Sequence, residues 1–481
     1  MTAKEQLFES VSQKQEQYIQ AADHIWEYAE TSFREYRSSQ ELIGILEKEG
    51  FAVERGLAGI PTAFSGTYGH GKPVIGILGE FDALAGLSQK AGVAVREPEV
   101  EGGNGHGCGH NCLGVGALAG AVAVKDYLQA HPEVSGTVIY LGCPAEEGGS
   151  GKVFMAREGI FEGLDAALTW HPYATANVFS GSTLAVIHLE VTFHGIAAHA
   201  AATPESGRSA LDGAELMNIG VQFLREHMAD KARVHYAFLD AGGKAANVVQ
   251  DYTKMEYSIR APKVAQAMAL CERVKKIAQG AALMTETTVE IELTSALSET
   301  IPNEVLERVL QANLEEAPFP VYTEEEYAFG AAINQSYEVQ ESATDLAAKL
   351  DPEWKKLLAA RAAKKGWNLN DFVLPYRHWE DPICASTDVG DVSFLCPTAM
   401  FFAPTAAARI PEHSWQYVAC NHTGIAHKGV IYAGQVMAGA CVDLMEHPEL
   451  VEQAKAEFAG RMEGQTYQCP IPADVLPDIG E

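Results

Sequence analysis

The sequence predicts an α/β fold that carries a second, α+β module within it, and three observations support this class. Up to about residue 180, short apolar segments alternate with helical patterns, as in a layered α/β domain. These apolar segments are nearly continuous, which is typical of strands in a sheet that is covered on both faces. From about residue 183, apolar and polar residues alternate instead, as in half-buried strands.

The elements of the first domain follow from periodicity. Residues 4–50 have apolar side chains at helical spacing, and residues 113–128 form an Ala/Gly/Val-rich stretch that suits a helix packed closely on a sheet. The apolar segments predicted as strands are 74–78, 137–141 and 166–169. The helices expected near the end of the chain are 302–313 and 429–445.

The inserted module is predicted at residues 183–299, so the first domain is discontinuous and comprises residues 1–182 and 300–481. Its predicted strands are 184–193, 234–238, 252–259 and 288–293, and its predicted helices are 210–227 and 264–284. Residues 335–380 are charged and Ala/Lys-rich, and we expect them to form a surface insertion.

Composition excludes several classes of function. The 481 residues include 35 basic and 64 acidic side chains, a net charge of −29, which disfavours nucleic acid and anionic membranes as partners. No apolar run is long enough for a transmembrane helix, and the first residues show no signal pattern. The nine cysteines are scattered and odd in number, which indicates a reduced, cytoplasmic protein and no disulfide framework.

Groups that bind metals occur at three places that the fold would bring together. Cys108 and His110 lie in a glycine-rich loop before the Ala/Gly-rich helix, Glu146 and Glu147 follow one predicted strand, and His171 follows another. In an open α/β sheet, ligands bind at the carboxyl ends of the strands. Each residue taken alone is more often structural, since a buried Cys is usually a small hydrophobe. Their joint placement favours a metal site.

Three rival functions fit the residues less well. A serine hydrolase would need a Gly-x-Ser-x-Gly elbow, which is absent from the sequence. A Cys108 nucleophile with His110 as its base would leave Glu146 and Glu147 without a role. A catalytically silent partner subunit is the third possibility, but it would not need the full set of metal-binding groups.

Several motifs resemble those of the M20 metallopeptidases, in the branch of amidohydrolases that cleave N-acyl amino acids. The motifs, in family order, are Glu80-Phe-Asp82-Ala-Leu, Cys108-Gly-His110-Asn111, Gly-Cys-Pro-Ala-Glu146-Glu147-Gly-Gly, residues 165–172 ending in His171-Pro172, and His194-Gly-Ile-Ala-Ala-His199. Within this branch, residues 283–289 and 386–393 are similar to the group that hydrolyses p-aminobenzoyl-glutamate.

The resemblance implies a zinc-peptidase-like catalytic domain, with a mixed sheet flanked by helices, and an inserted lid or dimerisation domain. It implies two divalent metal ions, Mn²⁺ or Zn²⁺, bridged by Cys108. The other metal ligands implied are His110, Glu147, His171 and His413. Glu146 would be the general base, and Asp82 would orient a ligand. For the last ligand, His427 is the second candidate and His422 the third.

The resemblance also implies roles for the inserted module. His199 would stabilise the oxyanion in a partner's site, and Asn247 and Arg260 would hold the substrate's carbonyl or carboxylate. The substrate would be an N-acyl or N-aroyl amino acid, although a dipeptidase is an alternative, and the chain would form a homodimer or a hetero-oligomer with a related subunit. The sequence departs from the pattern of this branch at two positions, because Glu80 and Asn111 stand where the branch usually has Asp. These two differences put the metal affinity and the metal preference in doubt.

Overall fold

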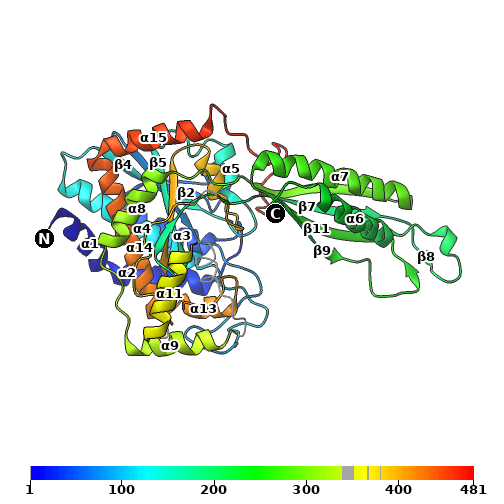
Figure 1. Cartoon of the computed structure of the whole chain (residues 1–481), viewed down its shortest axis with the longest axis horizontal. Coiled ribbons are helices and arrows are strands. Elements are labelled where there is room, and N and C mark those ends of the chain that lie inside the picture. The colour runs from blue at the N-terminus through cyan, green and yellow to red at the C-terminus, as the bar shows by residue number, and fades with distance from the viewer. Residues whose placement is uncertain (1, 338–350, 366–367, 380, 481) are drawn as a thin grey trace.

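The computed structural model describes residues 2–337, 351–365, 368–379 and 381–480 of the chain. It has two parts, a larger α/β body and an arm that extends from one side of it (Figure 1). Among the described residues, no helix combines the length and the apolar character needed to cross a membrane. The fold class predicted from the sequence is confirmed.

A mixed seven-stranded sheet forms the centre of the larger body, in the order β1-β2-β4-β3-β5-β13-β6. Its strands are β1 (Ala52–Arg55), β2 (Phe64–His70), β3 (Val74–Glu80), β4 (Gly136–Cys143), β5 (Ala166–Tyr173), β6 (Asn177–Phe179) and β13 (Thr398–Pro404). The four central strands β4, β3, β5 and β13 are parallel, and the strands outside them pair antiparallel. The carboxyl ends of β3, β4 and β5 therefore meet at one edge.

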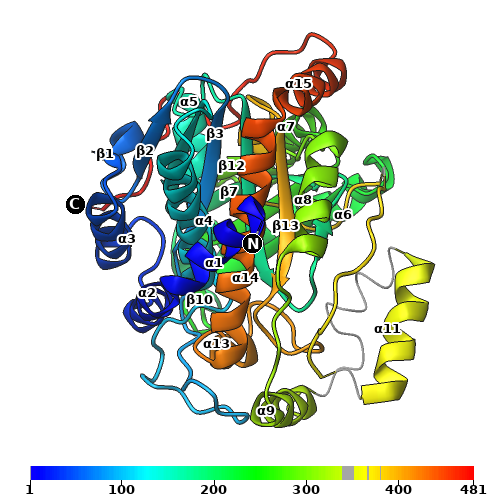
Figure 2. The same cartoon turned by 90° about the vertical axis from the view of Figure 1, so that its left-hand side faces the viewer.

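Helices cover both faces of this sheet (Figure 2). One core is shared by α1 (Ala3–Gln13), α2 (Gln15–Tyr28), α3 (Tyr36–Lys48), α4 (His110–Ala130), α8 (Glu304–Glu316), α14 (Gly424–Glu446) and α15 (Pro448–Met462). The other face is covered by α5 (Gly151–Arg157) and α12 (Val389–Ser393). Strand β3 places Ile75 and Ile77 in the first core and Leu78 in the second, so the strand lacks polar side chains before Glu80 because both of its faces are buried.

Small residues let α4 lie close against the sheet. A Cβ on Gly116 would come within 2.6 Å of the Trp170 ring on β5, so only glycine fits this contact. Such close packing brings the first turn of α4, and the loop before it, down to the ends of the strands. The Ala/Gly-rich composition of residues 113–128 thus helps to place the Cys108 loop at the ends of the strands.

The arm contains a four-stranded antiparallel sheet in the order β12-β7-β11-β9, with α6 and α7 packed on one face (Figure 1). Its elements are β7 (Ala185–His194), α6 (Ala210–Leu224), β9 (Arg233–Asp240), β11 (Tyr252–Ala261), α7 (Val264–Thr285) and β12 (Thr288–Leu297). A small two-stranded antiparallel sheet of β8 (Ala198–His199) and β10 (Val248–Val249) lies at its far end. The domain boundaries at 182/183 and 299/300 stay a prediction.

Shorter helices and a C-terminal segment complete the chain. The helices α9 (Glu324–Gln335), α11 (Pro352–Lys365) and α13 (Trp415–Cys420) lie at the lower end of the body in both views, and short 3-10 turns cover Leu57–Gly59, Pro204–Ser206 and Arg225–His227. Of the insertion expected at 335–380, residues 338–350, 366–367 and 380 lie outside the described residues. Its described part is not wholly on the surface, because Trp354 is buried against Leu374.

The C-terminal segment, residues 463–480, crosses the junction between the body and the arm (Figure 1). Arg157 on α5 donates to the carbonyls of Pro472 and Val475, at 3.1 and 2.8 Å. Arg34 donates to the carbonyl of Asp478 at 3.0 Å. This segment also borders an open hollow that is lined in part by β12, so it lies next to both parts of the chain.

Candidate metal centre

The ends of the central strands bring most of the predicted site residues together. Asp82 comes two residues after β3, Glu146 and Glu147 come three and four residues after β4, and His171 lies near the end of β5. Because β3 is parallel to both β4 and β5, these side chains lie at the same edge of the sheet. The loop that precedes α4 adds Cys108 and His110 to this edge.

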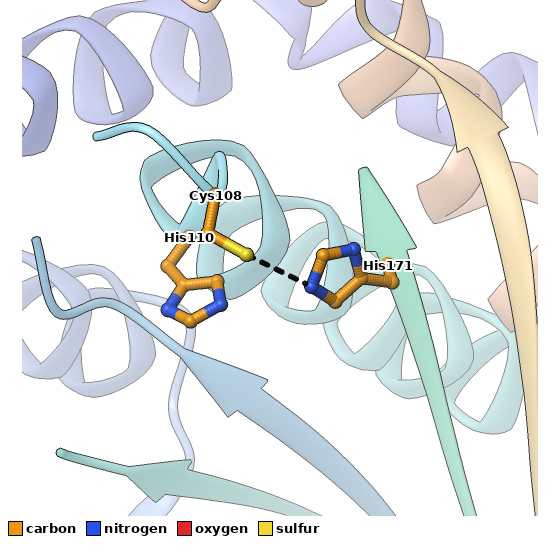
Figure 3. A group of neighbouring side chains, drawn as sticks. All are labelled: Cys108, His110 and His171. Carbon is orange, nitrogen blue, oxygen red and sulfur yellow. Dashed lines mark hydrogen bonds between the residues drawn. The ribbon is translucent and has the colours of Figure 1, made fainter. Parts of the chain in front are cut away.

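Cys108, His110 and His171 converge at the start of α4 (Figure 3). The Cys108 Sγ lies 3.4 Å from His171 Nε2, and these three side chains each offer one donor atom within 4.8 Å of the others. Two donors that share one metal ion at about 2.0–2.3 Å in tetrahedral geometry are about 3.5 Å apart. The observed spacing is therefore that of two ligands of one ion.

A second group of donors consists of Cys108, Glu147 and His413. His413 Nε2 lies 3.4 Å from Glu147 Oε2, the same kind of spacing. His413 has a left-handed backbone, with φ of +57°, and its N–H donates to the Gly107 carbonyl at 2.8 Å, which fixes it beside the Cys108 loop. Cys108 belongs to both groups, so its sulfur lies within 4.8 Å of the donor atoms of each.

The other two candidate histidines near the end of the chain lie away from these donor groups. His427 Nε2 is 2.7 Å from Asp23 Oδ1, and His422 Nε2 is 3.5 Å from the same oxygen. His427 is in the first turn of α14, since this helix begins at Gly424, earlier than the predicted residue 429. Neither imidazole belongs to a group of metal donors among the described residues, so the geometry favours His413 as the last ligand.

Asp82 is buried and ties two of the site residues together. Its Oδ1 is 2.8 Å from His110 Nδ1, and its Oδ2 accepts the backbone N–H of Glu147 at 2.9 Å. The bond at Nδ1 leaves His110 Nε2 to face the site. Although burial opposes its charge, the neighbouring His110 lowers the pKa of Asp82 below its ordinary value.

A buried lysine beside the site was not anticipated from the sequence. Lys152 Nζ lies 2.6 Å from Glu80 Oε1 and 2.6 Å from Asp388 Oδ1, and all three side chains are buried. The other oxygen of Glu80 is 3.3 Å from His110 Nε2. The available signal was a lysine at the start of a helix whose next four residues are apolar, since buried lysines are almost always paired.

The electrostatics of the site follow from burial and from its many carboxylates. Burial and the nearby Glu147 raise the pKa of the Cys108 thiol well above its ordinary value. Burial alone would lower the pKa of His110, but Asp82 beside it raises that pKa well above its ordinary range. Burial lowers the pKa of His171 to about 4. Burial and Glu80 raise the pKa of Glu146 well above its ordinary value.

These residues fit divalent metal ions. Within the described part of the chain, His110 Nε2 and Glu147 Oε1 are buried without a hydrogen-bond partner. Buried polar atoms left unpaired are costly, and a metal ion would satisfy both. Thiolate, imidazole and carboxylate donors together suit Zn²⁺ and related first-row ions.

The donors open into a cavity of about 480 Å³ at the junction with the arm. Arg260 on β11 also lines this cavity, and its guanidinium donates to Ser386 Oγ at 2.8 Å. Glu412, which no sequence pattern indicated although it precedes His413, lines it too and lies 3.5 Å from His171 Nδ1. The apolar part of the lining includes Phe179, Met400 and Phe402.

Two predicted residues lie away from the metal donors and from this cavity. His199 and Asn247 lie on or beside the paired strands β8 and β10 at the far end of the arm, and both are exposed (Figure 1). His199 Nδ1 accepts the backbone N–H groups of Ala201 and Ala202, each at 3.1 Å. The exposed Nε2 therefore carries the ring proton and can act as a donor.

Comparison with known proteins establishes the family. The model of peptidase family M20/M25/M40 matches residues 76–420, most of the chain. The chain belongs to this family. It is therefore a metal-dependent hydrolase of amide bonds, and the resemblance expected from the sequence motifs is confirmed.

Relatives extend this similarity over nearly the whole length. The chain is 46% identical over 472 residues to a p-aminobenzoyl-glutamate hydrolase subunit of Escherichia coli K12, covering 98% of this chain and 97% of the relative. The fold is shared with an aminobenzoyl-glutamate utilization protein from Klebsiella pneumoniae (TM-score 0.58, 17% identity, 88% and 98% of the two chains). It is also shared with YXEP of Bacillus subtilis, a dinuclear metal-binding M20 peptidase (TM-score 0.56, 17% identity, 90% and 99%).

Proposed function

We propose that this chain hydrolyses the amide bond of an N-aroyl or N-acyl amino acid, with p-aminobenzoyl-glutamate as the leading substrate. The observation that carries the proposal is the paired donor groups around Cys108, which open into the same cavity as Arg260. The identity to a p-aminobenzoyl-glutamate hydrolase subunit over 98% of the chain supports the choice of substrate.

Two divalent ions would be held by five side chains, with Cys108 shared between them. The set consists of Cys108, His110, Glu147, His171 and His413. When bound, such ions lower the pKa of water from 15.7 towards about 7 and polarise a carbonyl oxygen. Of the two metals expected from the sequence, the sulfur and the three imidazoles suit Zn²⁺, whereas the many carboxylates nearby suit Mn²⁺.

Glu146 would move the proton in this reaction. It lines the cavity beside the donors, and its Oε2 is 4.0 Å from His110 Nε2. A carboxylate there takes a proton from the attacking water and passes it to the amine of the leaving amino acid, a role worth about 10²–10⁴-fold in rate. Burial and Glu80 raise the pKa of this carboxyl above its ordinary value, the direction that makes it a stronger proton acceptor.

Arg260 would bind a carboxylate of the amino acid, and the apolar lining would bind the aroyl group. A guanidinium can donate two parallel hydrogen bonds to a carboxylate. Phe179 and Phe402 line the same cavity and offer aromatic surface to a benzoyl ring. The cavity thus combines the three features that an N-aroyl amino acid needs: an anion site, an aromatic surface and metal donors.

His199 and Asn247 would serve the site of a partner chain, because the β8–β10 strand pair at the far end of the arm lies far from the cavity of its own chain. The arm offers a surface for such an assembly. Its edge strand β9 is exposed at every residue except Val234, including the large apolar Tyr236, Phe238 and Leu239. An exposed edge strand is a template for pairing with another chain. The partner would be a second copy or a related subunit.

The test is to purify the chain alone, load it with Mn²⁺ or Zn²⁺, and measure release of the amino acid from matched amides. The panel consists of p-aminobenzoyl-glutamate, its acetyl counterpart, and a dipeptide. We expect fastest turnover of the N-aroyl glutamate. Faster cleavage of the dipeptide would identify a dipeptidase. Absence of turnover in the chain alone, with turnover restored by a related subunit, would identify a non-catalytic partner.

A further inference from the structure

A buried carboxylate behind the metal centre, that of Glu35, holds the turn that carries Glu146. Glu35 immediately precedes α3, but its side chain does not cap that helix. Its Oε1 instead accepts the backbone N–H groups of Phe33 and Ala145, both at 2.9 Å. Its Oε2 accepts the hydroxyl of Thr62 at 3.0 Å. One fully buried side chain therefore joins three segments that are distant in sequence.

The two amides that share Glu35 Oε1 belong to residues with unusual backbones. Phe33 has φ of +61° and Ala145 has φ of +60°, in the left-handed region that side chains other than glycine disfavour. Such conformations persist where the surroundings fix them, and they cluster at functional sites. The Phe33 ring adds to this restraint, because it covers Gly149, where a Cβ would lie 2.4 Å from the ring.

Glu146 lies between two backbone amides that are each held by a buried carboxylate. The N–H of Ala145 donates to Glu35, and the N–H of Glu147 donates to Asp82 Oδ2 at 2.9 Å. We propose that Glu35 is a positioning residue for Glu146, which it holds in place through the Ala145 amide. The inference rests on the proposed role of Glu146 as the base. A displacement of about 1 Å in a reacting group can cost about 10²-fold in rate.

The test compares variants of Glu35 that keep or lose the acceptor. Glu35→Met removes the acceptor at similar length, and we expect kcat to fall at least about 10-fold with KM and metal content per chain unchanged. Glu35→Gln keeps an oxygen that can accept both amides, so its kcat should stay within about 3-fold of the wild type. Thr62→Val removes only the partner of Oε2 and is the matched control, with kcat again near the wild type.

Three results would overturn the inference. The first is a Glu35→Met chain with wild-type kcat. The second is a Glu35→Met chain that loses bound metal in parallel with kcat. The third is a Glu35→Gln chain as slow as Glu35→Met. If Glu35→Met does not fold, Glu35→Asp carries the same expectation, because it is one methylene shorter and cannot reach both amides. If the wild-type chain binds no metal and shows no turnover, the proposed function is refuted as well. If the wild type and Glu35→Met are both fully active, only the role of Glu35 is refuted.

Discussion

Glu147 presents one carboxylate oxygen to His413 at 3.4 Å, while its own backbone N–H is held by the buried Asp82. The contact joins the end of β4 to the turn before α13, two segments from opposite halves of the sequence. Among the histidines near the end of the chain, this pairing favours His413 as a ligand, because His427 and His422 face Asp23 instead.

His413→Ala should therefore lose metal, whereas His427→Ala should keep it. Removal of a direct ligand should weaken binding of at least one ion by about 100-fold or more, since even partners of ligands contribute about 10–100-fold. Metal content after dialysis, measured by elemental analysis, checks this. Full occupancy in His413→Ala would transfer the role to another histidine.

Substitution of the adjacent glutamates should separate catalysis from metal binding. Glu146→Gln leaves the ligand set intact, so we expect normal metal content with turnover reduced at least about 10²-fold. Glu147→Gln removes a ligand and should lose metal and activity together. The two variants are matched in chemistry and adjacent in sequence, so opposite results would show that the roles are reversed.

Metal binding should tighten as the pH rises from about 6 to 8. The pKa of Cys108 is raised by burial and by Glu147, and that of His110 is raised by Asp82 against the effect of burial, so both groups hold protons at neutral pH without metal. An ion must displace these protons, and higher pH removes the competitor. Calorimetry in buffers of different ionisation enthalpy should detect proton release on binding. Binding that is independent of pH would contradict this.

Arg260→Met should raise KM for an N-aroyl glutamate with little change in kcat. Loss of a hydrogen bond to a charged group costs about 1.5–3 kcal/mol, or about 10–100-fold in affinity. Ser386→Ala is the control, since it removes the hydroxyl that Arg260 contacts and leaves the guanidinium in the cavity. A substrate amide that lacks the carboxylate should be cleaved equally by Arg260→Met and wild type.

If His199 serves a neighbouring chain, two inactive variants should complement each other. In a mixed dimer of Glu146→Gln and His199→Ala chains, one of the two sites combines an intact Glu146 with an intact His199. With random pairing, about half the dimers are mixed, so the ceiling is about a quarter of wild-type activity per site. Co-expression followed by purification of tagged mixed dimers tests this, and in purified mixed dimers the ceiling is about half of wild-type activity per site. Verified mixed dimers without activity would leave His199 no role in the partner's site.

The sequence predicts the catalytic centre better than the edges of the fold. The strands that carry Asp82, Glu147 and His171 are apolar runs that end in polar residues, so both the strands and the candidate ligands could be recognised locally. The strand β2 was missed because two of its seven residues are glycine, which weakens any strand signal. The strand β13, although apolar, carries no site residue at its end to draw attention to it.

Contacts between distant segments account for what could not be predicted at the site. Lys152 pairs with Asp388, 236 residues later in the chain, and no local pattern links the two. The same holds for Glu35 and Ala145, which are 110 residues apart. His413 was chosen because the motifs resemble a known family, and the spacing of the sequence alone could not have distinguished it from His422 and His427.

The C-terminal segment has a practical consequence for work with this protein. It runs across the junction of the two parts. Its Asp478 carbonyl accepts a hydrogen bond from Arg34, which lies between Phe33 and Glu35 in the sequence. A purification tag fused to this end would sit beside the arm and beside the turn that contacts Glu35. The amino terminus lies on the side of the body away from the arm (Figure 1). Affinity tags and surface attachment for kinetic work therefore belong at the amino terminus.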